Sequence, residues 1–154
     1  MASAEEQLPR KLAAILQADV VGYSRLMGQD ESGTLRRLKN HQKKLIDPAI
    51  KAFHGRVVKL MGDGMLMEFP SVVEAVACAV VIQEKFDHNN RGTPESDRIE
   101  LRIGINLGDV IVDGEDIYGD GVNVTARLEG LPEPGTLHRR SEQGRLVGSF
   151  SSSE

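Results

Sequence analysis

Two short apolar runs separated by Gly62-Asp63-Gly64 constrain the fold most strongly. Residues 56–61 and 65–69 each have the length of a strand, and the glycines between them suit a tight turn, so the segment predicts a β-hairpin. A hairpin joins antiparallel strands, whereas parallel strands need a long crossover connection. A flavodoxin-like sheet of the kind found in phospho-acceptor signalling domains is therefore disfavoured.

The elements on either side of the hairpin define a topology. Asp47-Pro48 is expected to break the first helical stretch in two, because the residue before proline avoids helical angles, and the capping box Ser71-Val72-Val73-Glu74 starts the next helix. The expected elements are a strand at 12–20, a helical stretch after Ser32-Gly33, the hairpin, a helix after Ser71, a polar loop at 87–97, a strand at 99–107 continued at 110–112, and a helix at 119–129. This order predicts an α+β fold with a ferredoxin-like βαββαβ core and an antiparallel sheet.

Composition narrows the class of function. The chain has 154 residues, which suits one domain. The net charge of −4 argues against a general grip on nucleic acid, since such domains are usually basic. No apolar run is long enough to span a bilayer, and the first residues lack the apolar stretch of a signal peptide. Cys78 is the only cysteine and lies in an apolar run, so we expect a reduced, cytoplasmic compartment.

Two aspartates are candidates for metal binding. Asp19 ends the first strand and Asp63 lies at the tip of the hairpin. The first strand of a split βαβ sheet lies centrally, beside the hairpin, so the two carboxylates can converge on one edge and hold two hard cations. The alternatives stay open at this point: Asp63 also suits a tight turn, and Asp19 also suits a strand end.

Two further segments offer polar groups for a phosphorylated ligand. The backbone N–H groups of Val20, Val21, Gly22, Tyr23 and Ser24 can turn toward an anion, although an ordinary turn explains the same residues. Asn123 and Arg127 are four residues apart on a predicted helix and so share one face. An amide and a guanidinium suit sugar and phosphate oxygens, and a surface pair making local hydrogen bonds is the simpler alternative.

Four segments together resemble one family. They are Ile15-Leu16-Gln17-Ala18-Asp19-Val20-Val21-Gly22-Tyr23-Ser24, Val58-Lys59-Leu60-Met61-Gly62-Asp63-Gly64, Leu101-Arg102-Ile103-Gly104-Ile105, and Asp116-Ile117-Tyr118-Gly119 through Asn123-Val124-Thr125-Ala126-Arg127. Their order and approximate spacing resemble those of class III nucleotidyl cyclase catalytic domains. The resemblance covers about residues 11–135, with an N-terminal extension at 1–10.

The resemblance implies a role for each residue. Asp19 and Asp63, with Val20, would hold two ions of Mg²⁺ or Mn²⁺, and residues 20–24 would contact the substrate. Lys59 and Asp116 would recognise the purine, Asn123 would position the ribose and Arg127 would stabilise the transition state. In the family these groups come from two subunits, which implies a homodimer with shared active sites.

Hydrogen-bonding chemistry predicts which purine base Lys59 and Asp116 would recognise. Adenine presents an acceptor at N1 and donors at N6, which complement a lysine and an aspartate. Guanine instead presents a donor at N1 and an acceptor at O6, so neither side chain finds its complement. Unpaired buried polar groups discriminate strongly between such ligands. ATP is therefore the expected substrate, and the expected activity is that of an adenylate cyclase that forms 3′,5′-cyclic AMP and pyrophosphate in intracellular signalling.

The last part of the sequence departs from the family pattern. No lysine follows Lys85, whereas the family carries a later lysine that contacts the triphosphate. Residues 136–154 show neither helical nor strand periodicity, so an irregular or disordered tail and a shortened C-terminal part are expected. Weak activity is then expected, and a catalytically impaired module that binds nucleotide or dimerises is the alternative function.

Overall fold

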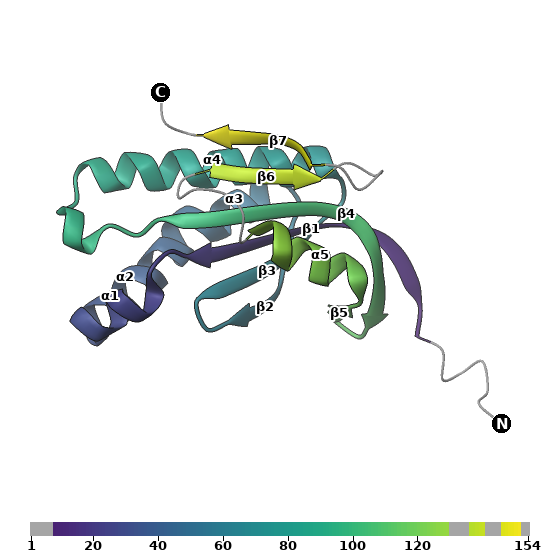
Figure 1. The fold of residues 1–154 in the computed structure, drawn as a ribbon, viewed down its shortest axis with the longest axis horizontal. Coiled ribbons are helices and arrows are strands. Elements are labelled where there is room, and N and C mark those ends of the chain that lie inside the picture. The colour runs from purple at the N-terminus through teal and green to yellow at the C-terminus, as the bar shows by residue number, and fades with distance from the viewer. Residues whose placement is uncertain (1–7, 130–135, 141–145, 152–154) are drawn as a thin grey trace.

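The computed structural model describes residues 8–129, 136–140 and 146–151, and Figure 1 shows their arrangement. The strands are β1 (Arg10–Val20), β2 (Arg56–Met61), β3 (Gly64–Phe69), β4 (Leu101–Asp113), β5 (Asp116–Tyr118), β6 (Thr136–Arg140) and β7 (Leu146–Ser151). The α-helices are α1 (Tyr23–Gln29), α2 (Glu31–His41), α3 (Asp47–Ala52), α4 (Val72–Arg91) and α5 (Asp120–Glu129). A π-helical segment, η2 (Gln42–Ile46), joins α2 to α3, and a 3₁₀ turn, η3 (Glu95–Asp97), precedes β4.

The sheet places β1 at its centre. Its strand order is β2-β3-β1-β4-β6-β7, with β5 pairing β4. Strand β1 pairs antiparallel with both β3 and β4, and β2 pairs antiparallel with β3 through the predicted hairpin. The α+β fold with a βαββαβ core and an antiparallel sheet among β1 to β5 is thus confirmed.

The two faces of the sheet carry different partners. Along β1, Ala14, Leu16 and Ala18 belong to the main core, which includes residues of α3 and α4. Successive side chains of a strand point to opposite faces, so Ala13 and Ile15 lie on the other face, in a smaller cluster that includes residues of β4 and β5. Helix α5 covers part of this second face, in front of the sheet in Figure 1.

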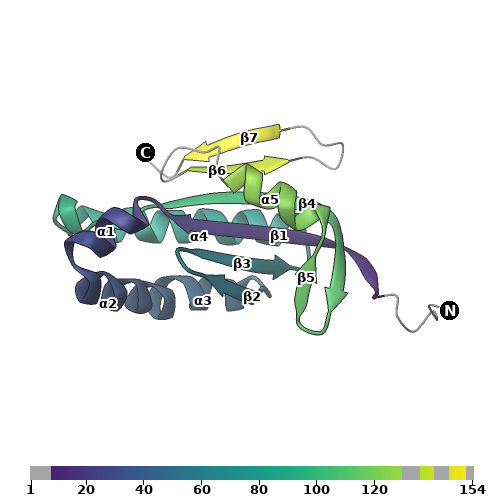
Figure 2. The same cartoon turned by 60° about the horizontal axis from the view of Figure 1, so that its bottom comes forward.

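Strand β4 curls, and its curl brings distant segments together. It runs for 13 residues, pairs with β1 along most of its length and then pairs with β5 at Ile111–Asp113. Figures 1 and 2 show the far end bending away from the sheet toward β2. The Arg56 guanidinium on β2 donates to the backbone oxygen of Glu115 at 2.8 Å. The β4–β5 hairpin is therefore held against β2.

The helices differ from the expected pattern in three places. A short helix, α1, precedes the expected one, which begins earlier, at Glu31, because the Asp30 carboxylate accepts from the Gly33 N–H. Asp47-Pro48 does not break the helix: Asp47 is helical, and its N–H donates to the Gln42 carbonyl across a π turn. That wider turn accommodates a proline, which has no N–H of its own to donate. Helix α4 continues to Arg91, through part of the expected loop.

The prediction of an irregular tail is wrong, because two strands form within residues 136–151. Strand β6 pairs parallel with β4, and β7 pairs antiparallel with β6. Strand β6 pairs along the edge of β4, and β7 then pairs along β6, so each strand depends on a partner that sequence periodicity does not reveal. Residues 141–145 and 152–154 of that expected tail lie outside the described part of the chain.

Candidate active site

The structure brings Asp19 and Asp63 to one end of the central strands. The Cα of Asp19 is in register with Gly64 on β3, and the Val20 N–H donates to the Asp63 carbonyl at 2.9 Å. Gly62 has φ of 53°, in the left-handed region that glycine tolerates at the first position of a two-residue hairpin turn. The turn therefore holds the backbone of Asp63 beside the end of β1.

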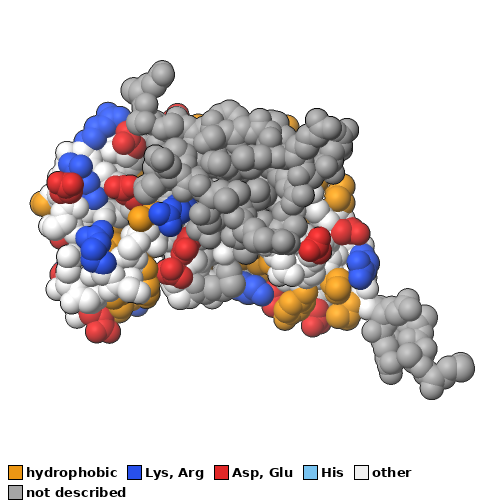
Figure 3. All heavy atoms as spheres, viewed as in Figure 1, with side chains coloured by type: hydrophobic (Ala, Val, Ile, Leu, Met, Phe, Trp, Pro, Cys, Tyr) orange, Lys and Arg blue, Asp and Glu red, His pale blue; other side chains and the backbone are white. Residues whose placement is uncertain are grey.

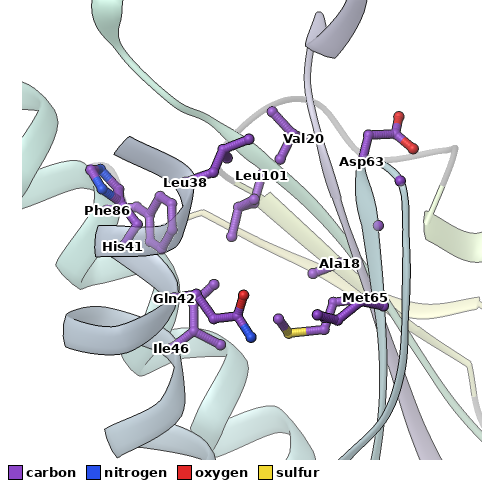
Figure 4. A pocket seen from close by; sticks show the side chains of 13 residues that line it. Ala18, Val20, Leu38, His41, Gln42, Ile46, Asp63, Met65, Phe86 and Leu101 are labelled. Carbon is purple, nitrogen blue, oxygen red and sulfur yellow. The ribbon is translucent and has the colours of Figure 1, made fainter. Parts of the chain in front are cut away.

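A cavity of about 120 Å³ lies behind this turn, on the helix-covered side of the sheet. Its walls are mostly apolar and include Ala18, Val20 and Leu38, with Gln42 and His41 as polar members. Figure 4 shows the Asp63 carboxylate pointing away from the cavity. Since Asp19 alternates with Ala18 and Val20 along β1, its side chain lies on the opposite face of the sheet. A ligand of both carboxylates would approach from that other face.

The turn after β1 offers fewer amides to an anion than the sequence suggests. The Val20 N–H is used by Asp63, and the Val21 N–H donates to the Glu100 carbonyl at 2.9 Å. Gly22 is left-handed, with φ of 64°, and caps α1. The first amides of a helix have no intrahelical acceptor, so contact with an anion would fall to Gly22, Tyr23 and Ser24.

Lys59 and Asp116 lie in direct contact, although 57 residues separate them. The Lys59 Nζ is 3.1 Å from the Asp116 Oδ1 and 3.4 Å from its Oδ2, and both side chains are about one-third exposed. The Ile117 N–H also donates to Oδ1, at 2.7 Å. The curl of β4 produces this contact, since it carries β5 to the neighbourhood of β2.

Neighbouring side chains favour the ionised form of Asp116. The Tyr118 hydroxyl and then the Lys59 ammonium lower the pKa of Asp116 by hydrogen bonding. The same carboxylate raises the pKa of Tyr118. Asp116 is thus an anionic acceptor at neutral pH, beside the cationic donor Lys59, and the pair is chemically suited to a ligand edge that carries one acceptor and one donor.

Helix α5 carries Asn123 and Arg127. The Asn123 side chain is exposed, whereas the Arg127 side chain lies outside the described part of the structure. The buried Asn106 amide on β4 holds the start of this helix by donating to the Gly121 carbonyl at 3.2 Å, and the Thr125 hydroxyl donates to the same carbonyl within the helix at 2.7 Å. A Cβ on Gly121 would lie 2.6 Å from the Asp109 carbonyl oxygen, so only glycine allows this close approach.

The sequence did not predict supporting roles for Asn106, Gly121 or Tyr118. An asparagine within an apolar strand, Ile105-Asn106-Leu107, is the one signal that could have drawn attention to Asn106, because a buried amide needs a partner. The partner of Asn106 is 15 residues away. Tyr118 has no comparable signal in the sequence.

The described residues contain neither a three-residue metal site nor a membrane-spanning helix. No group of three or more His, Cys, Asp or Glu side chains is placed to hold a metal ion by itself among them. No helix within residues 8–129 is long and apolar enough to cross a membrane. On the face in Figure 3, basic and acidic side chains are interspersed over the described surface.

His41 supports a prediction about pH. Burial lowers the pKa of His41 below 6.5, and the Asn89 amide lies 3.0 Å from its Nε2. The unfolded chain therefore binds a proton more readily than the folded one. We expect the free energy of unfolding to fall as the pH drops from about 7.5 to about 5.5, and to fall less in His41→Gln. Urea titrations at each pH measure this, with the exposed His54→Gln as the matched control. An equal pH dependence in His41→Gln and the parent would contradict it.

The chain is similar to a family of known proteins and to a solved structure. The profile of the family described as "Adenylate and Guanylate cyclase catalytic domain" matches residues 6–149. The structure is similar to "Adenylate/Guanylate Cyclase/Hydrolase from Silicibacter pomeroyi", with a TM-score of 0.78 and 47% identity, over 85% of this chain and 76% of that one.

Two curated relatives are similar in sequence. The "Putative adenylate cyclase 3" of Rhizobium meliloti (strain 1021) is 50% identical over 86% of this chain. The "Adenylate cyclase" of Streptomyces coelicolor is 31% identical over 82% of it. The chain spans only 22% and 32% of the lengths of these two proteins. Because the family profile matches most of the chain, the protein belongs to the family of adenylate and guanylate cyclase catalytic domains.

Proposed function

We propose that this domain is an adenylate cyclase that converts ATP to 3′,5′-cyclic AMP and pyrophosphate. The contact between Lys59 and Asp116, at 3.1 Å, carries the proposal. It sets a cationic donor beside an anionic acceptor, and adenine offers the complementary acceptor at N1 and donors at N6. Guanine would place N1–H against the ammonium and O6 against the carboxylate, which leaves both pairs mismatched. The two curated relatives that are named as adenylate cyclases also support the choice.

The metal sites are proposed at the end of β1. Cyclases of this family generally use two divalent metal ions. Asp19, Asp63 and the backbone oxygen of Val20 are hard oxygen donors, which Mg²⁺ and Mn²⁺ prefer. Mg²⁺ is commonly bound by one or two carboxylates together with substrate phosphates. A set of two carboxylates without a third acidic or histidine ligand therefore fits ions that arrive with a nucleotide.

The proposed reaction joins the ribose O3′ to the α-phosphorus and breaks the bond from that phosphorus to pyrophosphate. Bound metal ions would lower the pKa of the 3′-hydroxyl and share the charge of the triphosphate. Asn123 would orient the ribose through its amide, and Arg127, one helical turn away, would meet the negative charge that develops in the transition state. No nucleophilic side chain is required.

The active sites are proposed to be shared in a homodimer. The side chains of Asp19 and Lys59 both lie on the sheet face opposite the main core, since their strand neighbours Val20 and Leu60 line the cavity on the helix side. A second copy facing this surface could add its Lys59, Asp116, Asn123 and Arg127 to the metal aspartates. The proposed substrate ATP and the buried single cysteine, Cys78, fit a cytoplasmic compartment.

One assay tests the proposed activity directly. The purified chain is incubated with ATP or with GTP, in the presence of Mn²⁺ or Mg²⁺, and the products are separated by chromatography. We expect cyclic AMP to form faster than cyclic GMP. If neither cyclic nucleotide forms while circular dichroism shows a folded chain, the proposed activity is wrong.

A base-exchange variant tests the assignment of Lys59 and Asp116. In Lys59→Glu combined with Asp116→Cys, glutamate accepts from guanine N1–H and the thiol donates weakly to O6. We expect the ratio of kcat/KM for ATP to that for GTP to fall by at least about 10²-fold, because a site built to hydrogen-bond one base discriminates strongly against a base that leaves its polar groups unpaired.

The ion pair between Asp87 and Arg91 provides the matched control. It lies on α4, with N···O at 2.7 Å, and Asp87→Cys with Arg91→Glu makes the same chemical changes there. This control is expected to keep the parent ratio. A Lys59→Glu, Asp116→Cys variant that is as selective for ATP as the parent would show that these residues do not recognise the base.

A further inference from the structure

Tyr118 stands beside the two residues assigned to base recognition. It follows Asp116 by two positions on β5, so both side chains lie on the same side of that strand. Ile117 between them is fully buried in the smaller apolar cluster. This burial anchors β5 and directs Asp116 and Tyr118 together to the opposite side, where Tyr118 is 47% exposed.

Tyr118 touches both partners of the ion pair. The Lys59 Nζ lies 5.0 Å from the centroid of the Tyr118 ring, within the range of a cation–π interaction. The hydroxyl of the same residue also acts on the Asp116 carboxylate and lowers the pKa of Asp116. One aromatic side chain thus contacts the cation through its ring face and influences the anion through its hydroxyl.

Such a contact matters because the pair is not buried. An exposed lysine has a long flexible side chain, and an ion pair alone holds it weakly. Discrimination between purines depends on where the Lys59 donor and the Asp116 acceptor lie relative to each other. The site rejects the wrong base strongly only if both of these groups face a mismatched atom at the same time. The Tyr118 ring lies against Lys59 and belongs to the same strand as Asp116. It therefore restricts the positions of both charged groups.

We propose that Tyr118 is a positioning residue for base selection, which holds Lys59 and Asp116 in the arrangement that matches adenine. This inference rests on the proposed function, and it concerns selectivity rather than the chemical step. Tyr118 therefore affects the nucleotide preference and KM, and leaves kcat at saturating ATP close to that of the parent.

Two substitutions separate the parts of the side chain. Tyr118→Phe keeps the ring over Lys59 and removes the hydroxyl, whereas Tyr118→Leu removes both. We expect the ATP-to-GTP ratio of kcat/KM to fall about threefold in Tyr118→Phe and on the order of tenfold in Tyr118→Leu. Val73→Ala, at an apolar residue on α4 that is 76% exposed, is the control and is expected to keep the parent ratio.

Binding provides a readout that does not need turnover. Displacement of a fluorescent ATP analogue by unlabelled ATP and by GTP gives the ratio of their Kd values, and we expect it to change in the same order. An unchanged ratio in Tyr118→Leu, or a loss of kcat with no change in KM and in selectivity, overturns the inference about Tyr118. Absence of cyclic product from the parent chain overturns the proposed activity instead, and the Kd ratios then still decide the role of Tyr118.

Discussion

An Asp63→Asn variant is expected to form cyclic AMP about 10²–10³-fold more slowly than the parent chain and to remain folded. Asp63 is exposed in a two-residue turn, and its carboxylate points away from the cavity behind it. The substitution therefore removes a proposed, charged metal ligand without opening the core. Asp19→Asn is expected to have a similar effect. Initial rates at saturating ATP and Mn²⁺, with thermal unfolding of each variant, measure both effects.

Asp109→Asn provides the matched control for these two variants. Asp109 is an exposed aspartate on β4, in register with Leu12 near the other end of β1. Its loss is expected to leave the rate unchanged. The metal assignment would be refuted by an Asp63→Asn or Asp19→Asn chain that turns over ATP at the parent rate.

Mixing two inactive variants is expected to restore activity. Asp63→Ala removes a proposed metal ligand, and Arg127→Ala removes the group proposed to act on the partner's substrate, so each homodimer is expected to be inactive. A heterodimer has one site with both defects and one with neither. If subunits exchange at random, half of the dimers are heterodimers, and the mixture regains about a quarter of the parent activity.

A second mixture controls for nonspecific rescue. Asp19→Ala and Asp63→Ala both affect the metal-binding half, so every site in their heterodimer still lacks one aspartate, and this mixture is expected to stay inactive. Heterodimer formation is verified with two affinity tags. Shared active sites would be contradicted if the Asp63→Ala and Arg127→Ala mixture formed heterodimers but no cyclic AMP. Activity of the Asp19→Ala and Asp63→Ala mixture would contradict them as well.

Local sequence signals correctly predicted the elements that need only local chemistry. Gly62-Asp63-Gly64 predicted the β2–β3 hairpin, because Gly62 can adopt the left-handed φ that the turn requires. Ser71 predicted the start of α4, and its hydroxyl accepts from the Glu74 N–H as in a capping box. The order of these elements was then sufficient to predict a central β1.

Elements stabilised by distant partners were predicted less well. Helix α4 extends into the expected loop, where Asn89 meets His41 and Asn90 donates to the Ile99 carbonyl at 2.9 Å. These polar residues look like loop residues because their partners lie elsewhere in the chain. Strands β6 and β7 were missed for the same reason, since β6 pairs with the edge of β4 and β7 pairs with β6.

By itself the sequence determined the antiparallel core and the nearness of Asp19 to Asp63, because a short turn and the pairing of adjacent strands leave few other arrangements. Only the tertiary structure decided the contact of Lys59 with Asp116 and Tyr118, the residues of the proposed base site. That contact depends on the curl of β4, which carries β5 across to β2. Curvature arises from twist and packing summed along 13 residues, and no local pattern encodes it.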